Sequence, residues 1–296
     1  MKKALLQLHA AVFLAGFTAV LGKLIKLNEG LLVWYRLLIT VVTLGLILLF
    51  KNQLKKIALK DALKIGAVGV IVALHWVTFY GSVKYANVSV ALTCFSATGF
   101  FTAFFEPLIF RKKMVIAEIL LGVLAMLGIG IIFGFHPEYK LGICFGIISA
   151  VGSALFPIFN KGFVERFAPR TVTFYELGGG LISLAFLLPL YLMLFPAEYY
   201  IPTTSDWGWL LVLAWFCTVL SFDLQLNALK KISPFTANLT YNLEPLYGII
   251  LAFIFFKENE HLRPQFYIGL LLITAAVLWQ MYRVTRDKNK VQGLTE

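Results

Sequence analysis

Polar side chains that could bind a solute stand together in one apolar stretch of the sequence, residues 237–246. Asn238 and Asn242 are four residues apart, so a helix places both on one face, and Tyr241 and Glu244 fall on the adjacent face. Amide, phenol and carboxyl groups together supply donors and acceptors of hydrogen bonds. We therefore expect this polar strip to line a solute-binding cavity.

Glu244 is followed directly by Pro245, and two roles are open for the acid. Proline lacks an N–H group, so it predicts a kink in the helix at this point. A charge buried among apolar side chains is costly, which makes it a functional candidate. The functional hypothesis is that Glu244 carries a coupling proton. The structural alternative is that Glu244 is a neutral, hydrogen-bonded group that fixes the kink.

Two other apolar stretches contain candidate site residues. His75 could bind solute or titrate, although a buried histidine with satisfied hydrogen bonds is the more common arrangement. Trp76 and Tyr80 are four residues apart and form either an aromatic wall of the cavity or a packing surface at the lipid interface. Ser96 either lines the cavity or bonds a carbonyl of its own helix.

The elements that must position these residues are membrane-spanning helices. Of the 296 residues, 60% are hydrophobic and only 14% are charged, and the mean hydropathy is +0.84. Soluble domains average roughly 45–50% apolar and about 25% charged residues. The composition therefore predicts an all-α integral membrane protein, because helices satisfy every backbone polar group inside lipid.

Apolar runs of about 20 residues are long enough to span a bilayer. The sequence contains ten: 4–22, 31–50, 62–81, 88–110, 115–134, 141–160, 172–194, 207–226, 234–256 and 265–282. If the N-terminus is cytoplasmic, 19 of the 26 lysines and arginines fall in cytoplasmic segments. This bias predicts that both termini are cytoplasmic, in a multi-pass protein of the cell (plasma or inner) membrane. The basic residues behind the net charge of +11 are therefore explained by membrane orientation, and we expect no nucleic-acid partner.

Two halves of the sequence resemble each other at a spacing of about 138–147 residues. Trp34-Tyr35-Arg36-Leu37 matches Phe174-Tyr175-Glu176-Leu177, and Lys84-Tyr85-Ala86-Asn87 matches Lys230-Lys231-Ile232-Ser233. Because each copy holds five spans, an odd number, the second copy must enter the membrane upside down. Inverted repeats of this kind are typical of secondary transporters. The predicted parts are a first repeat at 1–135, a second at 136–283 and a flexible cytoplasmic tail at 284–296.

The repeat pairs Arg36 with Glu176, and Gly22 with Asn160. Although Arg36 and Glu176 have opposite charges, each lies only about 8 Å below its surface at 1.5 Å per residue, in opposite leaflets. We therefore expect no ion pair between them. Arg36 either extends its side chain to the interface or attracts an anionic substrate. Asn160 is a further candidate for solute contact.

Most of the chain, residues 4–282, resembles the EamA-type transporters of the drug/metabolite transporter superfamily. The resemblance depends on the five-plus-five layout, on Trp34-Tyr35-Arg36, on Ala237–Leu246 with its Asn-rich run into Glu-Pro, and on Phe255-Phe256-Lys257-Glu258. It implies a basket-like ten-helix fold and export or exchange of small metabolites, such as amino acids. In one departure from the repeat, Glu106-Pro107 stands near the end of its span and is not equivalent to Glu244-Pro245.

Several activities lack their sequence signatures. There is no GxxxxGK[ST] for ATP and no HExxH or GxSxG. The three cysteines show no CxxC spacing, so we expect no metal and no cofactor. Expected partners are a small-molecule solute and the lipid bilayer. Pairs with GxxxG spacing, such as Gly142 and Gly146, predict close helix packing within a monomer or across a homodimer. An intramembrane enzyme acting on a lipid or lipid-linked substrate, and a channel, are the alternative functions.

Overall fold

The architecture is taken from a computed structural model of the chain. It describes residues 2–53, 55–111, 113–135, 137–221, 223–224, 228, 240–241 and 243–292. All regular elements in these ranges are helices. They are α1 Lys2–Leu24, α2 Glu29–Phe50, α3 Leu59–Tyr85, α4 Val88–Phe95, α5 Thr98–Phe110, α6 Ile116–Phe135, η1 Pro137–Tyr139, α7 Lys140–Val164, α8 Pro169–Leu194, α9 Thr204–Ala214, η2 Trp215–Leu220, α12 Glu244–Phe256, η3 Glu258–Glu260 and α13 Pro264–Gln292.

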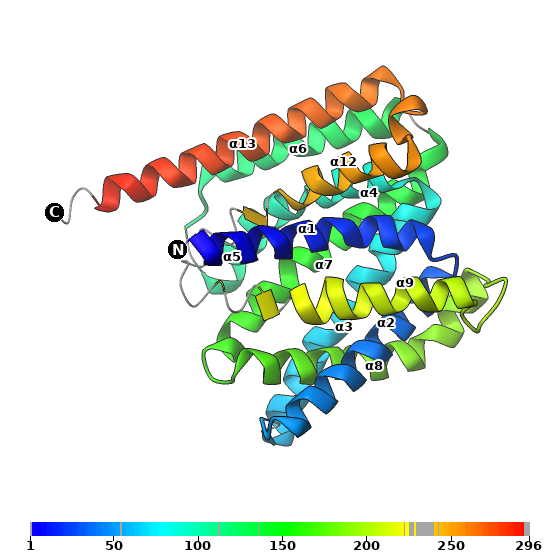
Figure 1. Cartoon of the computed structure of the whole chain (residues 1–296). Coiled ribbons are helices and arrows are strands. Elements are labelled where there is room, and N and C mark those ends of the chain that lie inside the picture. The colour runs from blue at the N-terminus through cyan, green and yellow to red at the C-terminus, as the bar shows by residue number, and fades with distance from the viewer. Residues whose placement is uncertain are drawn as a thin grey trace.

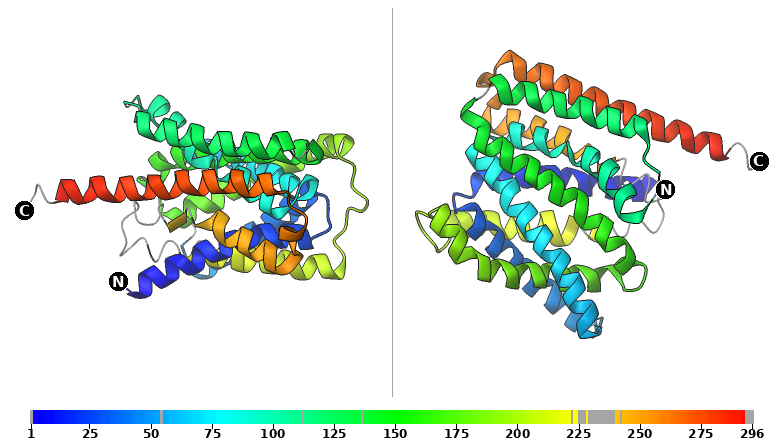
Figure 2. Two further views of the ribbon diagram at one scale, coloured as in Figure 1. Left: turned by 90° about the horizontal axis from the view of Figure 1, so that it is seen from above. Right: turned by 180° about the vertical axis from the view of Figure 1, so that it is seen from behind.

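The helices lie side by side as an elongated bundle, with both chain ends at the same end of the molecule (Figure 1). α6 and α13 run together along one edge, while α2, α3 and α8 form the opposite side (Figure 2). In the described residues, six helical segments have the length and hydropathy of a membrane span, and four apolar helical segments are shorter. The prediction of an all-helical membrane fold is confirmed.

Three predicted spans differ from the helices that form. The span at 88–110 is interrupted at Ser96 and Ala97, which separate α4 from α5. The span at 207–226 changes from α-helix to π-helix at Trp215. In the span at 234–256, α12 begins at Glu244, so Pro245 stands in the first helical turn. Proline fits this position because its missing N–H has no partner there in any helix. Residues 229–239 and 242 lie outside the described part of the chain, so the kink at Pro245 stays a prediction.

Glycines allow α3 and α8 to cross with their backbones in contact. A Cβ atom added to Gly179 would meet the backbone of Gly66, and one added to Gly180 would lie 2.7 Å from the carbonyl oxygen of Gly69. Small residues at such crossings are the usual means of helix association in membranes, where burial from water does not drive packing. Gly142 and Gly146 likewise face Ala86 and Cys94 of the same chain, so this pair packs within the chain.

Candidate functional site

Arg36 of α2 is buried against α3 and η2, with only 4% of its surface exposed. Its Nη1 donates to the hydroxyl of Tyr80 at 2.7 Å, and its Nε and Nη2 donate to Oγ1 of Thr218 at 3.2 and 3.0 Å. The guanidinium also lies over the ring of Trp76, 3.7 Å from its centroid. The prediction that Arg36 could extend to the interface is therefore wrong, and Trp76 and Tyr80 both contact its guanidinium.

The π-helix η2 brings Thr218 to Arg36. Thr218 Oγ1 donates to the carbonyl of Leu213, five residues earlier, at 3.0 Å, so its lone pairs are available to the guanidinium. Segments of π-helix occur mostly as single turns and are frequent at functional sites. Thr218 was not a candidate from the sequence, because a hydroxyl in an apolar run usually bonds its own helix. Thr218 differs from other threonines in apolar runs only because the folded chain brings Arg36 to its hydroxyl.

The charge of Arg36 is not neutralised by a neighbouring carboxylate in the part of the chain that the structure describes. Its hydrogen-bond acceptors are neutral hydroxyls, which use three of the five guanidinium N–H groups. Glu244 is close enough to interact electrostatically with both Arg36 and Tyr80. A buried arginine with spare donors, and an acid nearby, form a site that can take an anionic group, a zwitterion or a proton.

Glu244 lies at the start of α12, where this helix crosses α1. A Cβ atom added to Gly16 of α1 would lie 2.9 Å from the carbonyl oxygen of Glu244, and Gly248 faces Gly16 in return. The two glycines thus let α1 and α12 approach closely beside the acid. Tyr241, from the same predicted strip, packs with Ala4, Leu8 and Ala228.

His75 links α3 to α7 through Ser149. It directly precedes Trp76, the residue whose ring lies under Arg36. Its Nδ1 lies 2.9 Å from the carbonyl oxygen and 2.8 Å from Oγ of Ser149, and its ring stacks near Phe95 and Phe156. Because a carbonyl can only accept, Nδ1 carries a proton and Nε2 is the acceptor. His75 is thus buried, with its Nδ1 bonded to Ser149 of α7.

Glu176 is held by Asn160 in the second half of the chain. Asn160 Nδ2 donates to Glu176 Oε2 at 2.8 Å, and Glu176 is buried. Glu176 is the repeat equivalent of Arg36, and Asn160 is that of Gly22. These two residues of the second repeat are therefore bonded to each other. As expected, Arg36 and Glu176 form no ion pair among the described residues.

The remaining predicted residues are not gathered at Arg36. Ser96 donates to Leu92 O at 3.1 Å, so it bonds its own helix. Asn238 and Asn242 lie outside the described residues.

Replacing Thr218 with valine is expected to lower the free energy of unfolding by about 1.5–3 kcal/mol, the usual range for hydrogen bonds to charged groups. Valine has nearly the same shape, but it leaves two buried N–H groups of Arg36 without an acceptor. Thr218→Ser keeps the acceptor and is the matched control. Denaturant titration in detergent micelles measures both, and a valine variant as stable as the serine variant contradicts the assignment.

Comparison with known proteins agrees with this architecture. The model of the EamA-like transporter family matches the chain twice, at residues 2–134 and 140–282. An uncharacterized transporter of Clostridium kluyveri is 21% identical over 98% of this chain and 97% of its own length. The uncharacterized transporter YetK of Bacillus subtilis is 27% identical over 86% and 80%. One crystal structure superposes with a TM-score of 0.61 at 15% identity, covering 93% of this chain and 96% of that chain, and so shares the fold.

The two family matches together cover nearly all of the chain. They also account for its multiple apolar helices, which place it in the cell membrane as a multi-pass protein. It is a transporter rather than an enzyme, and it belongs to the EamA-like transporter family.

Proposed function

We propose that this protein is a secondary transporter that exports or exchanges a small polar metabolite, such as an amino acid, by alternating access. The observation that carries the proposal is the buried Arg36, which has neutral hydrogen-bond partners, spare donors and an acid nearby. Charged residues inside a membrane protein generally mark the path of a substrate or ion. Arg36 would bind the carboxylate of the solute through two parallel N–H donors, and Trp76 and Tyr80 would enclose its body.

The proposed architecture has ten spans in two inverted five-helix repeats, at residues 1–135 and 136–283. Two observations support it. The same family model matches both halves, and the helix contacts recur when the halves are exchanged. α1 packs on α12 as α7 packs on α5, and α3 packs on α8 as α9 packs on α2. Five helices per copy, an odd number, would make the copies inverted, and the distribution of lysines and arginines supports cytoplasmic termini.

Glu244 has one of two roles in this proposal. It receives either the ammonium group of a zwitterionic solute or a coupling proton, because it is an acid within electrostatic range of Arg36. The two roles differ in their response to a pH gradient. If Glu244 carries a proton, an imposed gradient accelerates flux in the parent protein and has no effect in Glu244→Gln.

The experiment is flux in proteoliposomes, with a metabolite pool analysed by mass spectrometry, with and without a pH gradient. We expect one class of small polar solute to cross the parent membrane and Glu244→Gln to reduce its flux roughly tenfold, as expected for loss of one interaction of a charged group. Glu106→Gln is the matched control, because Glu106 is not the repeat equivalent of Glu244. Absence of flux for every solute, or equal flux in both variants, contradicts the proposed function or its site respectively.

A further inference from the structure

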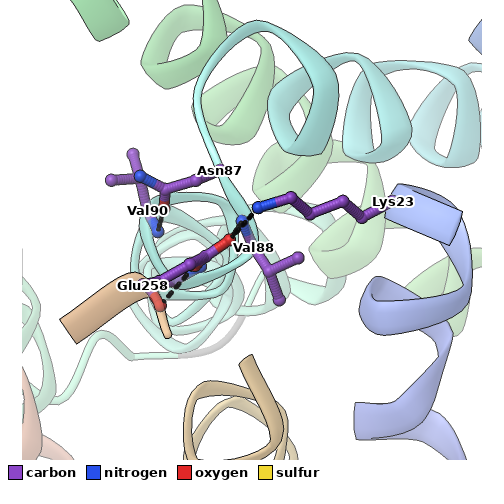
Figure 3. Close-up of polar contacts among 6 residues, drawn as sticks. Lys23, Asn87, Val88, Val90 and Glu258 are labelled. Atoms are coloured by element: carbon purple, nitrogen blue, oxygen red, sulfur yellow. Dashed lines mark hydrogen bonds and ion pairs between the residues drawn. The ribbon is translucent and has the colours of Figure 1, made fainter. Parts of the chain in front are cut away.

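Glu258 joins three segments at the end of the molecule that lies away from both termini (Figure 1). Its Oε1 accepts from Nζ of Lys23 at 2.7 Å and from the backbone N–H of Val88 at 3.1 Å. Its Oε2 accepts from the backbone N–H and the hydroxyl of Ser89, at 2.8 and 2.7 Å. The carboxylate thus ties the end of α1 and the first turn of α4 to the turn after α12 (Figure 3).

In this contact the glutamate is buried and the lysine is partly exposed. Glu258 is only 4% exposed, while the side chain of Lys23 is 37% exposed. The first N–H groups of a helix have no partner within the helix. Glu258 accepts from those of Val88 and Ser89, and the side chain of Asn87 accepts from that of Val90 at 2.8 Å. The four hydrogen bonds to Glu258 can all form only when the end of α1, the start of α4 and the turn after α12 lie together.

The three segments are also the walls beside Glu244. Gly16 of α1 contacts the start of α12, and Leu92 of α4 contacts Gly248 of α12. If the proposed transport releases solute between these helices, toward the end without the termini, the groups that Glu258 joins must separate. The contact would then close this route for as long as it is intact.

The other copy of the repeat lacks the acid at the matching position. Lys23 lies 4.4 Å from the ring centroid of Phe256, and Lys161 lies 5.2 Å from that of Phe110. α12 and α5 then end in the same way, with Lys257 at φ 52° and Arg111 at φ 53°. The next residue is Glu258 in one copy and Lys112 in the other. A lysine at position 112 cannot supply the carboxylate that Glu258 supplies, so the sequence of the first repeat does not provide the matching acid.

We propose that Lys23, Glu258 and Ser89 form a latch that holds the extracellular end of the transport pathway closed and biases the resting protein toward the inward-facing state. This inference depends on the proposed alternating access and on cytoplasmic termini. In the described residues, the end with the termini has three other ion pairs, Asp61 with Arg166, Arg170 with Asp223 and Glu118 with Arg283. These pairs do not join α1, α4 and α12. Breaking the latch is therefore expected to favour opening to the outside.

The test is the reactivity of a buried thiol from outside the cell. Thr93 is fully buried on α4, one turn after Ser89, and its hydroxyl donates to Ser89 O. Thr93→Cys in a background with Cys94, Cys144 and Cys217 replaced by alanine reports the opening of this end. Intact cells are treated with a membrane-impermeant maleimide, and the labelled fraction is followed over time. Flux of the metabolite pool is measured separately in the same variants.

Lys23→Met is expected to raise the labelling rate about threefold or more, since it removes one partly exposed charged partner. Glu258→Gln is expected to raise it roughly tenfold, because it removes the buried charge that accepts four bonds. Lys23→Arg keeps the ion pair and should label like the parent. Lys26→Met is the matched control, because Lys26 bonds Asp206 through its backbone N–H.

Unchanged labelling in both Lys23→Met and Glu258→Gln would overturn the latch, even if flux confirms a transporter. An equal rise in Lys26→Met would also overturn it, because that pattern shows general loosening. Faster labelling in the latch variants, without flux of any solute in the parent, would support the latch and contradict the proposed transport. The two inferences are therefore tested separately.

Discussion

Arg36→Met is expected to reduce solute flux by about 100-fold or more, since it removes two charge-assisted hydrogen bonds to the solute, each of which contributes about 1.5–3 kcal/mol. The fold is expected to remain intact. Replacing a buried charge with an apolar side chain of similar volume is often neutral or stabilising, and Trp76 and Tyr80 supply apolar packing around it. Loss of flux without loss of stability is thus the signature of a binding role.

Arg36→Lys separates charge from geometry. Lysine keeps the positive charge but cannot present two parallel donors to a carboxylate, so we expect flux between that of the parent and that of Arg36→Met. Flux is measured in proteoliposomes, and the melting temperature in detergent is recorded for each variant. A methionine variant that melts well below the parent and regains flux when stabilised by lipid would instead indicate a purely structural arginine.

Gly179→Val is expected to lower the free energy of unfolding by more than about 3 kcal/mol, the upper end of the usual range for overpacking. A Cβ atom at this position would meet the backbone of Gly66 on α3, and backbone cannot move aside as a flexible side chain can. Size-exclusion chromatography and thermal denaturation in detergent measure the effect.

Gly178→Val is the matched control on the same helix. Nothing lies within 4 Å of a Cβ atom built on Gly178, so its valine has room. Both variants carry the same change in helix propensity, and the difference between them reports the crossing of α3 and α8. Equal stability of the two would show that α3 and α8 do not pack through these glycines.

Hydropathy alone was enough to predict the class of fold. Lipid offers no hydrogen-bond partners to the backbone, so each span must satisfy its own N–H and C=O groups. Apolar runs of sufficient length therefore form helices. The interruptions were not predictable. The break at Ser96 and Ala97 and the π-helix at Trp215 depend on contacts with other helices, and an apolar run gives no sign of either.

Four of the residues that lie together around Arg36 could be named from the sequence, but their arrangement could not. Tyr80 and Thr218 are 44 and 182 residues from Arg36, and no local pattern links such positions. Arg36, Trp76, Tyr80 and Glu244 were candidates because polar or aromatic groups in apolar runs are few. Lys23 and Glu258 were not candidates, since each stands at the end of a span, where a charge needs no explanation.

The central claim, alternating access through a site at Arg36, is tested most directly by counterflow. Proteoliposomes are loaded with an unlabelled amino-acid mixture and diluted into trace amounts of the same labelled compounds. The account predicts transient accumulation of one class of label above its external concentration in the parent, and its loss in Arg36→Met. A channel only equilibrates the label. Simple equilibration in the parent, or equal accumulation in Arg36→Met, would contradict the account.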